Sequence, residues 1–197
     1  NIKKISKSEF LKKSFNEPVY VNLETKDYVT HPNKSVFELE HFIQFPQEYH
    51  SNAVKYLKES NIYISAHYWD PASPKIFNKN ELKNLNNLQV IGDITCDVDG
   101  SVPSTIKSTT IENPNFYLDK INFQESKFEN SSLGIMAVDN LPSELPRNSS
   151  TEFGDGVVNE ILPYIFAKDD GRILNATIAE NGHFLKKYNY LENYINS

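Results

Sequence analysis

The chain has 197 residues, of which 39% are hydrophobic and 12% aromatic, so it can bury the core of one domain or of one domain and part of another. Its formal net charge of −6 gives no field that would attract a polyanion, and we expect no nucleic-acid partner. The lysines within residues 3–13 are followed closely by acidic residues, which predicts a solvated helix face.

Cysteine usage and hydropathy indicate a cytoplasmic protein. The single cysteine, Cys96, excludes an internal disulfide framework and a cysteine-rich zinc site. No run approaches the roughly 18 apolar residues that span a bilayer, and the polar start is not a signal peptide. We therefore expect a cytoplasmic location, no membrane partner and no bound metal. Because the chain begins with Asn1 and not Met, we expect it to be part of a longer protein.

The first 60 residues predict helices joined by short extended segments. Apolar residues at helical spacing predict a helix over residues 8–15, and apolar alternation predicts an extended segment over 18–23. A capping-box pattern at Ser35 predicts a helix that Pro46 ends or kinks. A second amphipathic helix is predicted over residues 47–60.

Three apolar runs predict the strands of a parallel sheet. Residues 61–69 predict a buried strand, and residues 88–95 predict another after a short helix. Residues 133–138 are continuously apolar, which is typical of a parallel strand covered on both faces. Short extended pieces are expected at 108–111 and 116–118 in the connection. This order of helices and strands is typical of an α/β fold.

Helices are predicted after the third strand. Pro142 suits the first turn of a helix that continues to about residue 166, although two glycines within it weaken the pattern. Residues 172–180 predict another helix, with residues 181–182 as its stop. A last helix is expected over residues 185–195.

Each predicted strand leads directly into polar or aromatic side chains. In an open parallel sheet, ligands bind in the crevice beyond the carboxyl ends of the strands. Here the three endings are residues 67–70, 93–97 and 138–141. Strands commonly end in polar loops, but three such endings in one sheet favour a binding site at this edge.

The endings and their surroundings resemble the signature blocks of one enzyme family. The blocks are Gly92-Asp93-Ile94-Thr95-Cys96-Asp97-Val98-Asp99-Gly100-Ser101, then Thr109-Thr110-Ile111, and Met136-Ala137-Val138-Asp139-Asn140-Leu141-Pro142-Ser143-Glu144-Leu145-Pro146-Arg147. They resemble the lysine-forming saccharopine dehydrogenases and the lysine-ketoglutarate reductase half of aminoadipic semialdehyde synthases, relatives of alanine dehydrogenase and transhydrogenase. The resemblance covers Thr30 to Asn196 and corresponds to the carboxy-terminal half of the family's enzyme.

The resemblance implies roles for nine residues. The cofactor, NAD or NADP, would be bound by Tyr68, Ile94, Val138, Asp139, Asn140 and Leu141, and the amino-acid substrate by Thr95, Cys96 and Asp97. An apolar wall suits a nicotinamide ring, and hydroxyl and carboxylate groups suit a charged amino acid. Without the resemblance, Tyr68 and Trp69 are more simply packing residues, Cys96 a small buried hydrophobe and Asp139 a helix cap.

The motifs that would complete the chemistry are missing. No strand is followed by a G-x-G-x-x-G turn, which holds the pyrophosphate in the dinucleotide fold. The family's acid-base Lys and His lie in its amino-terminal part, so we assign no catalytic residue in this chain. Residues 97–100 resemble part of a calcium loop without its further ligands. None of the five histidines has a metal-ligand spacing, and only His67 adjoins the predicted site.

The expected fold is α/β, the second half of a Rossmann-like parallel sheet with flanking helices. Residues 1–166 would form this partial nucleotide-binding domain, and residues 167–197 a helical segment that, by the resemblance, packs on a missing substrate domain. Half a doubly wound sheet has an unpaired edge, so the expected partner is the missing amino-terminal half or a symmetry mate.

The function implied by the resemblance is that of an NAD(P)-dependent oxidoreductase acting on saccharopine. Hydride transfer to or from its secondary amine, with hydrolysis of the imine, would connect saccharopine with lysine and 2-oxoglutarate. The fragment alone is expected to be inactive. Two alternatives are an alanine dehydrogenase-like enzyme and a non-catalytic binding module, the latter because residues 147–150 depart from the family pattern.

Overall fold

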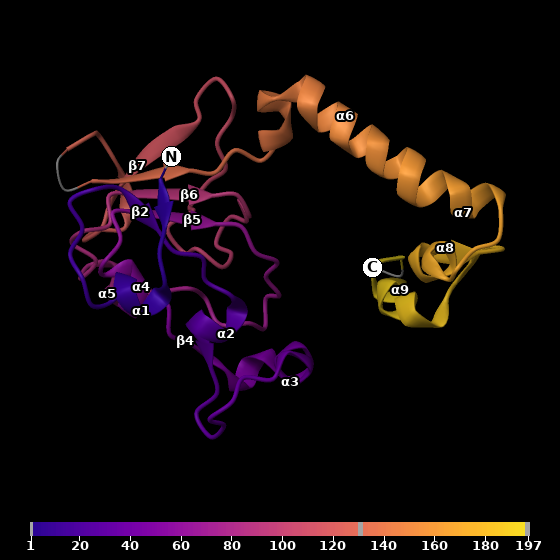
Figure 1. Ribbon diagram of the computed structural model, residues 1–197, viewed down its shortest axis with the longest axis horizontal. Helices are drawn as coiled ribbons and strands as arrows, with labels where there is room; N and C mark the ends of the chain where they lie inside the picture. Colours follow the sequence, from indigo (N-terminus) through magenta and orange to yellow (C-terminus); the bar gives the residue numbers. More distant parts are fainter. Residues whose placement is uncertain (1, 130–131, 196–197) are drawn as a thin grey trace. The chain divides into compact units, whose positions relative to one another are not determined.

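The computed structural model describes residues 2–129 and 132–195, so Asn196, where the family resemblance ends, lies outside the described residues. The chain folds as two compact units, residues 1–141 and residues 142–197 (Figure 1). The sequence predicted a nucleotide-binding part, residues 1–166, and a segment that packs on a substrate domain, residues 167–197. This functional division stays a prediction.

The first unit is organised around a five-stranded mixed sheet with the strand order β5-β6-β9-β7-β8. Strands β5, β6 and β9 are parallel, whereas β7 is antiparallel to both β9 and β8. The expected α/β fold is confirmed. The strands are β5 (Ile62–Ser65), β6 (Val90–Asp93), β7 (Asn115–Asp119), β8 (Gln124–Ser126) and β9 (Leu133–Met136).

The three predicted parallel strands are present but shorter than their apolar runs. The expected extended piece at 116–118 is β7, and the piece at 108–111 contributes one parallel bridge, between Thr109 and Val138. Strand β8 was not predicted. It is a polar segment that exists because it pairs with β7 through a turn at Asp119, whose carboxylate accepts from the backbone N–H of Ile121 at 2.7 Å.

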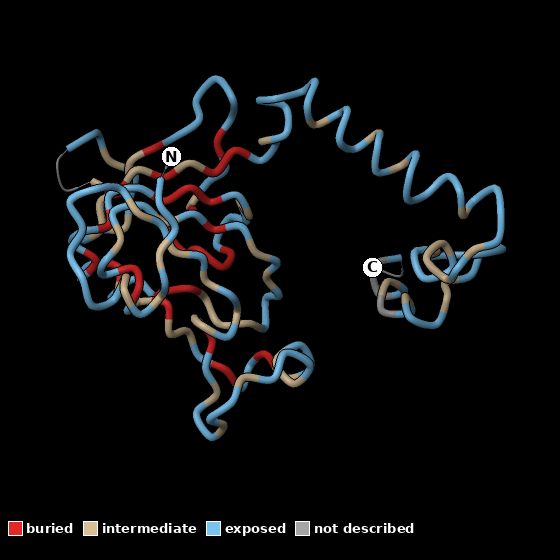
Figure 2. The backbone as a smooth tube through the Cα atoms, viewed as in Figure 1, coloured by how far each residue is buried: buried red, intermediate tan, exposed pale blue. Residues whose placement is uncertain are grey.

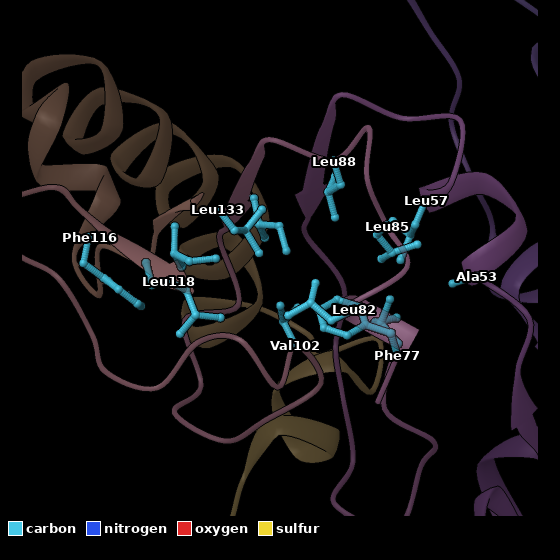
Figure 3. Packing of buried hydrophobic residues seen from close by; sticks show 14 residues of the cluster. Ala53, Leu57, Phe77, Leu82, Leu85, Leu88, Val102, Phe116, Leu118 and Leu133 are labelled. Atoms are coloured by element: carbon cyan, nitrogen blue, oxygen red, sulfur yellow. The ribbon is translucent and has the colours of Figure 1, made fainter. Parts of the chain in front are cut away.

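The core lies on one face of this sheet. Short helices α4 (Val54–Leu57) and α5 (Lys79–Leu82) bring apolar side chains against the inward residues of the strands (Figure 3). The core side chains are at most 4% exposed, and they are Ala53, Leu57, Ile76, Phe77, Leu82, Leu85, Leu88, Ile91, Val102, Phe116, Leu118, Leu133, Ile135 and Ala137.

The opposite face of the sheet is open at β5. Ile62 is 62% exposed and Ile64 is 63% exposed, whereas Ser65 is buried. Figure 2 shows that buried and exposed stretches alternate along the chain of the first unit. The prediction that this run is a buried strand is therefore wrong within the described residues. The apolar composition of the strand was read correctly, but successive side chains point to opposite faces, and only one face is covered.

Helix α5 is held by a capping box. The Asn78 side chain accepts from the backbone N–H groups of Asn80 and Glu81 at 2.9 and 3.0 Å, and Glu81 Oε2 accepts from Asn78 N at 2.7 Å. We expect Asn78→Ala to lower the free energy of unfolding by about 1 kcal/mol, because two N–H groups lose their acceptor. Urea unfolding followed by circular dichroism measures this loss. Asn80→Ala is the control, since only the backbone of Asn80 takes part, and an equal loss there would contradict the capping role.

The segment before the sheet is less helical than predicted. The helix expected from Ser35 begins only at Leu39, and the one expected over 47–60 is interrupted because residues 50–51 pair with residues 29–30. The elements are β1 (Lys3–Lys4), α1 (Lys7–Phe10), β2 (Val19–Tyr20), α2 (Thr25–Tyr28), β3 (Val29–Thr30), α3 (Leu39–Gln44), the 3-10 helix η1 (Pro46–Glu48) and β4 (His50–Ser51).

The second unit contains the predicted long helix, with one irregular turn. Pro163 has no N–H to donate, and the chain widens into a π-helical turn just before it, where Leu162 N–H donates to Val157 O. The segments are the 3-10 helix η2 (Leu141–Glu144), α6 (Pro146–Gly156), the π-helix η3 (Val157–Ile161) and α7 (Leu162–Phe166).

The end of the second unit differs from the prediction. Residues 181–182, expected to end a helix, instead form the turn of a hairpin, with φ of 51° at Asn181 and 82° at Gly182. The helix before them ends earlier, and the last predicted helix is mostly 3-10. The elements are α8 (Arg172–Ala176), β10 (Ala179–Glu180), β11 (His183–Phe184), the 3-10 helix η4 (Lys186–Leu191) and α9 (Glu192–Ile195).

Candidate functional site

The three parallel strands end at the same edge of the sheet. Ser65, at the end of β5, pairs in register with Asp93 at the end of β6, and Gly92 pairs with Met136 at the end of β9. The residues that follow each strand therefore emerge together. This is the edge at which open parallel sheets bind ligands, as the sequence predicted.

The last residue of β6, Asp93, is the buried centre of this edge. Its side chain is 0% exposed, and Oδ2 accepts from the Thr105 hydroxyl at 2.6 Å while Oδ1 accepts from the Thr95 hydroxyl. Asp93 lies within the signature block, but the family resemblance implies no role for it. The available signal was a carboxylate at the end of an otherwise apolar strand, which must find partners to be buried.

The substrate-facing residues predicted after β6 lie in a tight turn. Cys96 has a φ of 50° and Asp99 a φ of 56°. Gly100 N–H donates to Asp97 O at 3.0 Å, and a Cβ at Gly100 would lie 2.5 Å from Asp97 Cβ, so glycine is required there. The turn fixes the backbone of Cys96 and Asp97 and places Asp97 in solvent, where it can meet a charged ligand.

Cys96 is not placed as a nucleophile. The residue is partly buried, and burial raises the pKa of its thiol, with the nearby Asp97 carboxylate acting in the same direction. A thiol with a raised pKa stays protonated near neutral pH and reacts slowly. If Cys96 contacts a ligand, it does so as a small neutral side chain.

Aromatic and imidazole side chains follow β5. Tyr68 is 91% exposed, whereas the Trp69 indole N–H is buried and has no hydrogen-bond partner among the described residues. Trp69 thus lies against the protein, as a packing residue would. His67 is half-buried, and burial lowers the pKa of its imidazole, although the nearby Asp93 and Asp97 carboxylates oppose this.

The residues after β9 form a turn. Val138 is 3% exposed, so of this residue only the backbone can reach a ligand, while Asp139 and Asn140 are exposed and Leu141 is partly exposed. The strand end is fixed by Thr109, whose N–H donates to Ala137 O at 2.8 Å. The nine predicted site residues all lie at the carboxyl ends of β5, β6 and β9. Their division between cofactor and substrate stays a prediction.

The residues present fit one end of a dinucleotide. Exposed Tyr68 and Ile94 offer apolar surface beside the polar turns, which suits the planar rings of a nucleotide cofactor. None of the described residues forms the glycine-rich strand-turn-helix that holds a pyrophosphate. Within residues 2–129 and 132–195, no cluster of three or more His, Cys, Asp or Glu side chains could hold a metal ion.

Comparison with known proteins agrees with this geometry. Residues 19–195 match the family model described as alanine dehydrogenase/PNT, C-terminal domain. The alpha-aminoadipic semialdehyde synthase of Arabidopsis thaliana is 28% identical over 181 residues, covering 85% of this chain and 17% of the relative. The mitochondrial enzymes of that name from Bos taurus and Rattus norvegicus are each 25% identical over 183 residues, covering 75% of this chain and 20% of the relative. The chain thus spans about a fifth of the length of these relatives.

Proposed function

The chain belongs to the alanine dehydrogenase/PNT C-terminal domain family, and from this premise we propose that it is the cofactor-binding and substrate-binding part of a saccharopine-forming or saccharopine-oxidising enzyme. The family is one of dehydrogenases, and its domains bind NAD or NADP in general. The proposed reaction is reversible hydride transfer between that cofactor and the secondary amine of saccharopine. Hydrolysis of the imine gives lysine and 2-oxoglutarate.

The observation that carries the proposal is the meeting of the three strand ends. The blocks that resemble saccharopine dehydrogenases lie around Asp93 and Asp139, which are 46 residues apart in the chain, but they follow neighbouring parallel strands of one sheet. The relatives reported above are named alpha-aminoadipic semialdehyde synthases, which is the kind of enzyme that these blocks resemble. The strand geometry and the family resemblance therefore both support a site at the edge where the parallel strands end.

In this proposal the chain binds and orients the reactants. The turn after β9, residues 138–141, borders the nicotinamide, and Tyr68 and Ile94 lie against the rest of the cofactor. The turn after β6, residues 95–97, faces the amino acid, where the Asp97 carboxylate attracts its amine. When bound, NAD or NADP supplies the hydride acceptor or donor. Holding both partners in one orientation is the contribution that this chain can make to the rate.

Turnover by the full-length protein tests the proposal. We expect it to oxidise saccharopine with NAD or NADP, and we expect Asp139→Ala to lower kcat/KM about tenfold, equal to about 1.4 kcal/mol of transition-state stabilisation. Asp155→Ala, which removes an exposed carboxylate on α6, should leave kcat/KM unchanged. The assay follows reduced nicotinamide absorbance.

The same assay, together with a measurement of NAD and NADP binding, separates the alternatives. Turnover of alanine and not of saccharopine would support the alanine dehydrogenase-like alternative and overturn the substrate. Failure to bind either cofactor would support a non-catalytic module and overturn the enzyme proposal. The departure at residues 147–150 is the feature of the chain that favours this last candidate.

The remaining expectations concern partners and location. Among the described residues, no helix combines the length and apolarity needed to cross a membrane. We propose that the chain acts beside the remainder of a longer polypeptide or a second copy, and that neither nucleic acid nor membrane is its partner. A cytoplasmic location remains an expectation that cell fractionation can test, since the animal relatives named above are called mitochondrial.

A further inference from the structure

The hydroxyl of Thr95 is held in one orientation by Asp93. Thr95 follows β6, and its hydroxyl donates to Asp93 Oδ1, while the Thr105 hydroxyl donates to Asp93 Oδ2 at 2.6 Å. A hydroxyl group carries one hydrogen, so a threonine that donates to a carboxylate has only lone pairs left for a second partner. Among the residues that the structure describes, none donates to the Thr95 hydroxyl oxygen. Thr95 can therefore act towards a ligand only as a hydrogen-bond acceptor.

The two threonines that hold Asp93 differ in their access to solvent. Thr105 is 0% exposed, so a ligand cannot reach it and its hydroxyl serves only to hold the carboxylate. Thr95 is partly exposed, and it lies in the turn at the candidate site. The same carboxylate thus binds one hydroxyl that is closed to ligands and one that belongs to a residue with accessible surface.

The charges in this turn favour a cationic partner for Thr95. Asp97 is exposed and forms no ion pair with any described residue, whereas Asp99 in the same turn pairs with Lys75 at 3.1 Å. A ligand carboxylate or carbonyl oxygen placed against the Thr95 hydroxyl would meet a lone pair, with the negative charge of Asp97 two residues along the chain. A ligand ammonium group supplies both the N–H donor and the positive charge that these two side chains lack.

Of the two amines of lysine, the one that does not react fits this position. In the proposed reaction the ε-nitrogen must lose a proton before it can attack the keto carbon of 2-oxoglutarate, and a neighbouring carboxylate favours the protonated form. Binding the ε-nitrogen between Thr95 and Asp97 would therefore oppose the reaction. The α-ammonium group stays charged throughout and can keep both interactions.

We propose that Thr95, whose hydroxyl hydrogen is donated to Asp93, accepts a hydrogen bond from the α-ammonium group of lysine, with Asp97 as the countercharge. This inference rests on the proposed function, since it requires lysine as the amino-acid substrate. It names the part of that substrate that the turn after β6 recognises, and it makes Thr95 a residue that distinguishes an amino acid from an oxo acid.

Steady-state kinetics of the full-length protein in the saccharopine-forming direction test this role, because lysine and 2-oxoglutarate are then separate substrates. We expect Thr95→Val to raise the KM for lysine about 10-fold, since a hydrogen bond to a charged group is lost, and to leave kcat and the KM for 2-oxoglutarate unchanged. Thr95→Ser, which keeps the hydroxyl, should restore the natural KM. Thr105→Val is the matched control, because it removes the other hydroxyl from the same carboxylate and leaves Thr95 in place.

The outcomes separate this inference from the proposed function. If the natural protein forms no saccharopine from lysine and 2-oxoglutarate, the proposed function fails and this inference fails with it. If it forms saccharopine and Thr95→Val leaves the KM for lysine unchanged, or raises the KM for 2-oxoglutarate instead, only the role of Thr95 is overturned. An equal rise of the KM for lysine in Thr105→Val would also overturn it, because both hydroxyls would then act only by holding Asp93.

The value of kcat tests which amine is bound. A fall in kcat for Thr95→Val with an unchanged KM for lysine would indicate contact with the reacting nitrogen and would overturn the assignment to the α-ammonium group. Thr95→Ala removes the hydroxyl without adding a methyl group, and it provides the same comparison if the valine variant does not fold. Circular dichroism spectra identify the folded variant on which the comparison is made.

Discussion

Replacing Asp93 with leucine is expected to lower the free energy of unfolding by about 3 kcal/mol. The side chain is 0% exposed and accepts hydrogen bonds from the hydroxyls of Thr95 and Thr105. Leucine has nearly the same shape but accepts neither bond, so two hydroxyls lose their acceptor, one of them fully buried. Each loss costs about 1–3 kcal/mol. Urea unfolding of the full-length protein, followed by circular dichroism, measures the change.

Two further variants separate the hydrogen bonds from the packing. Asp93→Asn keeps one carbonyl oxygen as an acceptor and is expected to lose about half as much stability. Thr105→Val removes the buried donor and leaves the carboxylate with the Thr95 hydroxyl, which predicts an intermediate loss. If Asp93→Leu unfolds at the same urea concentration as the natural protein, these hydrogen bonds contribute no net stability and the description of this edge is wrong.

The predictions that succeeded depend on patterns of apolar and polar residues within a short stretch of sequence. Runs of β-branched and apolar residues bounded by polar residues favour strands, and such runs identified β5, β6 and β9. Parallel strands then bring their ends to one edge, which placed the turns after them together. The match over residues 19–195 confirms the family, whereas the roles of the site residues stay a prediction.

The failures are cases where a distant partner determines the local structure. Residues 50–51 leave a helical pattern because residues 29–30 pair with them, and β8 is a strand only because β7 is beside it. Side-chain burial depends in the same way on elements that the local sequence does not contain. Asp93 is held at this edge by its burial and by the hydroxyls of Thr95 and Thr105, and the partnership with Thr105, 12 residues along the chain, is not visible in the sequence pattern.

The 197-residue chain on its own is expected to associate in solution. Strand β5 ends the strand order, and among the described residues it pairs only with β6, so its other backbone edge is open. Ile62 and Ile64 are more than half exposed beside that edge. An open edge with apolar side chains pairs readily with another chain, which would cover both features. Light scattering after size-exclusion chromatography, with mass spectrometry of every component, measures this.

A charged residue on the open face distinguishes association through β5 from nonspecific association through other apolar surface. We expect Ile64→Lys to shift the chain towards monomer, because a lysine on an edge strand opposes pairing with a second copy. Ile121→Lys is the matched control, since Ile121 is 72% exposed in the turn between β7 and β8 and should leave association unchanged. The remainder of a longer polypeptide, added separately, should compete with self-association at the same edge. A cooperatively folded monomer with no other polypeptide would show that the sheet is complete in itself, and the assignment to half of a doubly wound sheet would have to be abandoned.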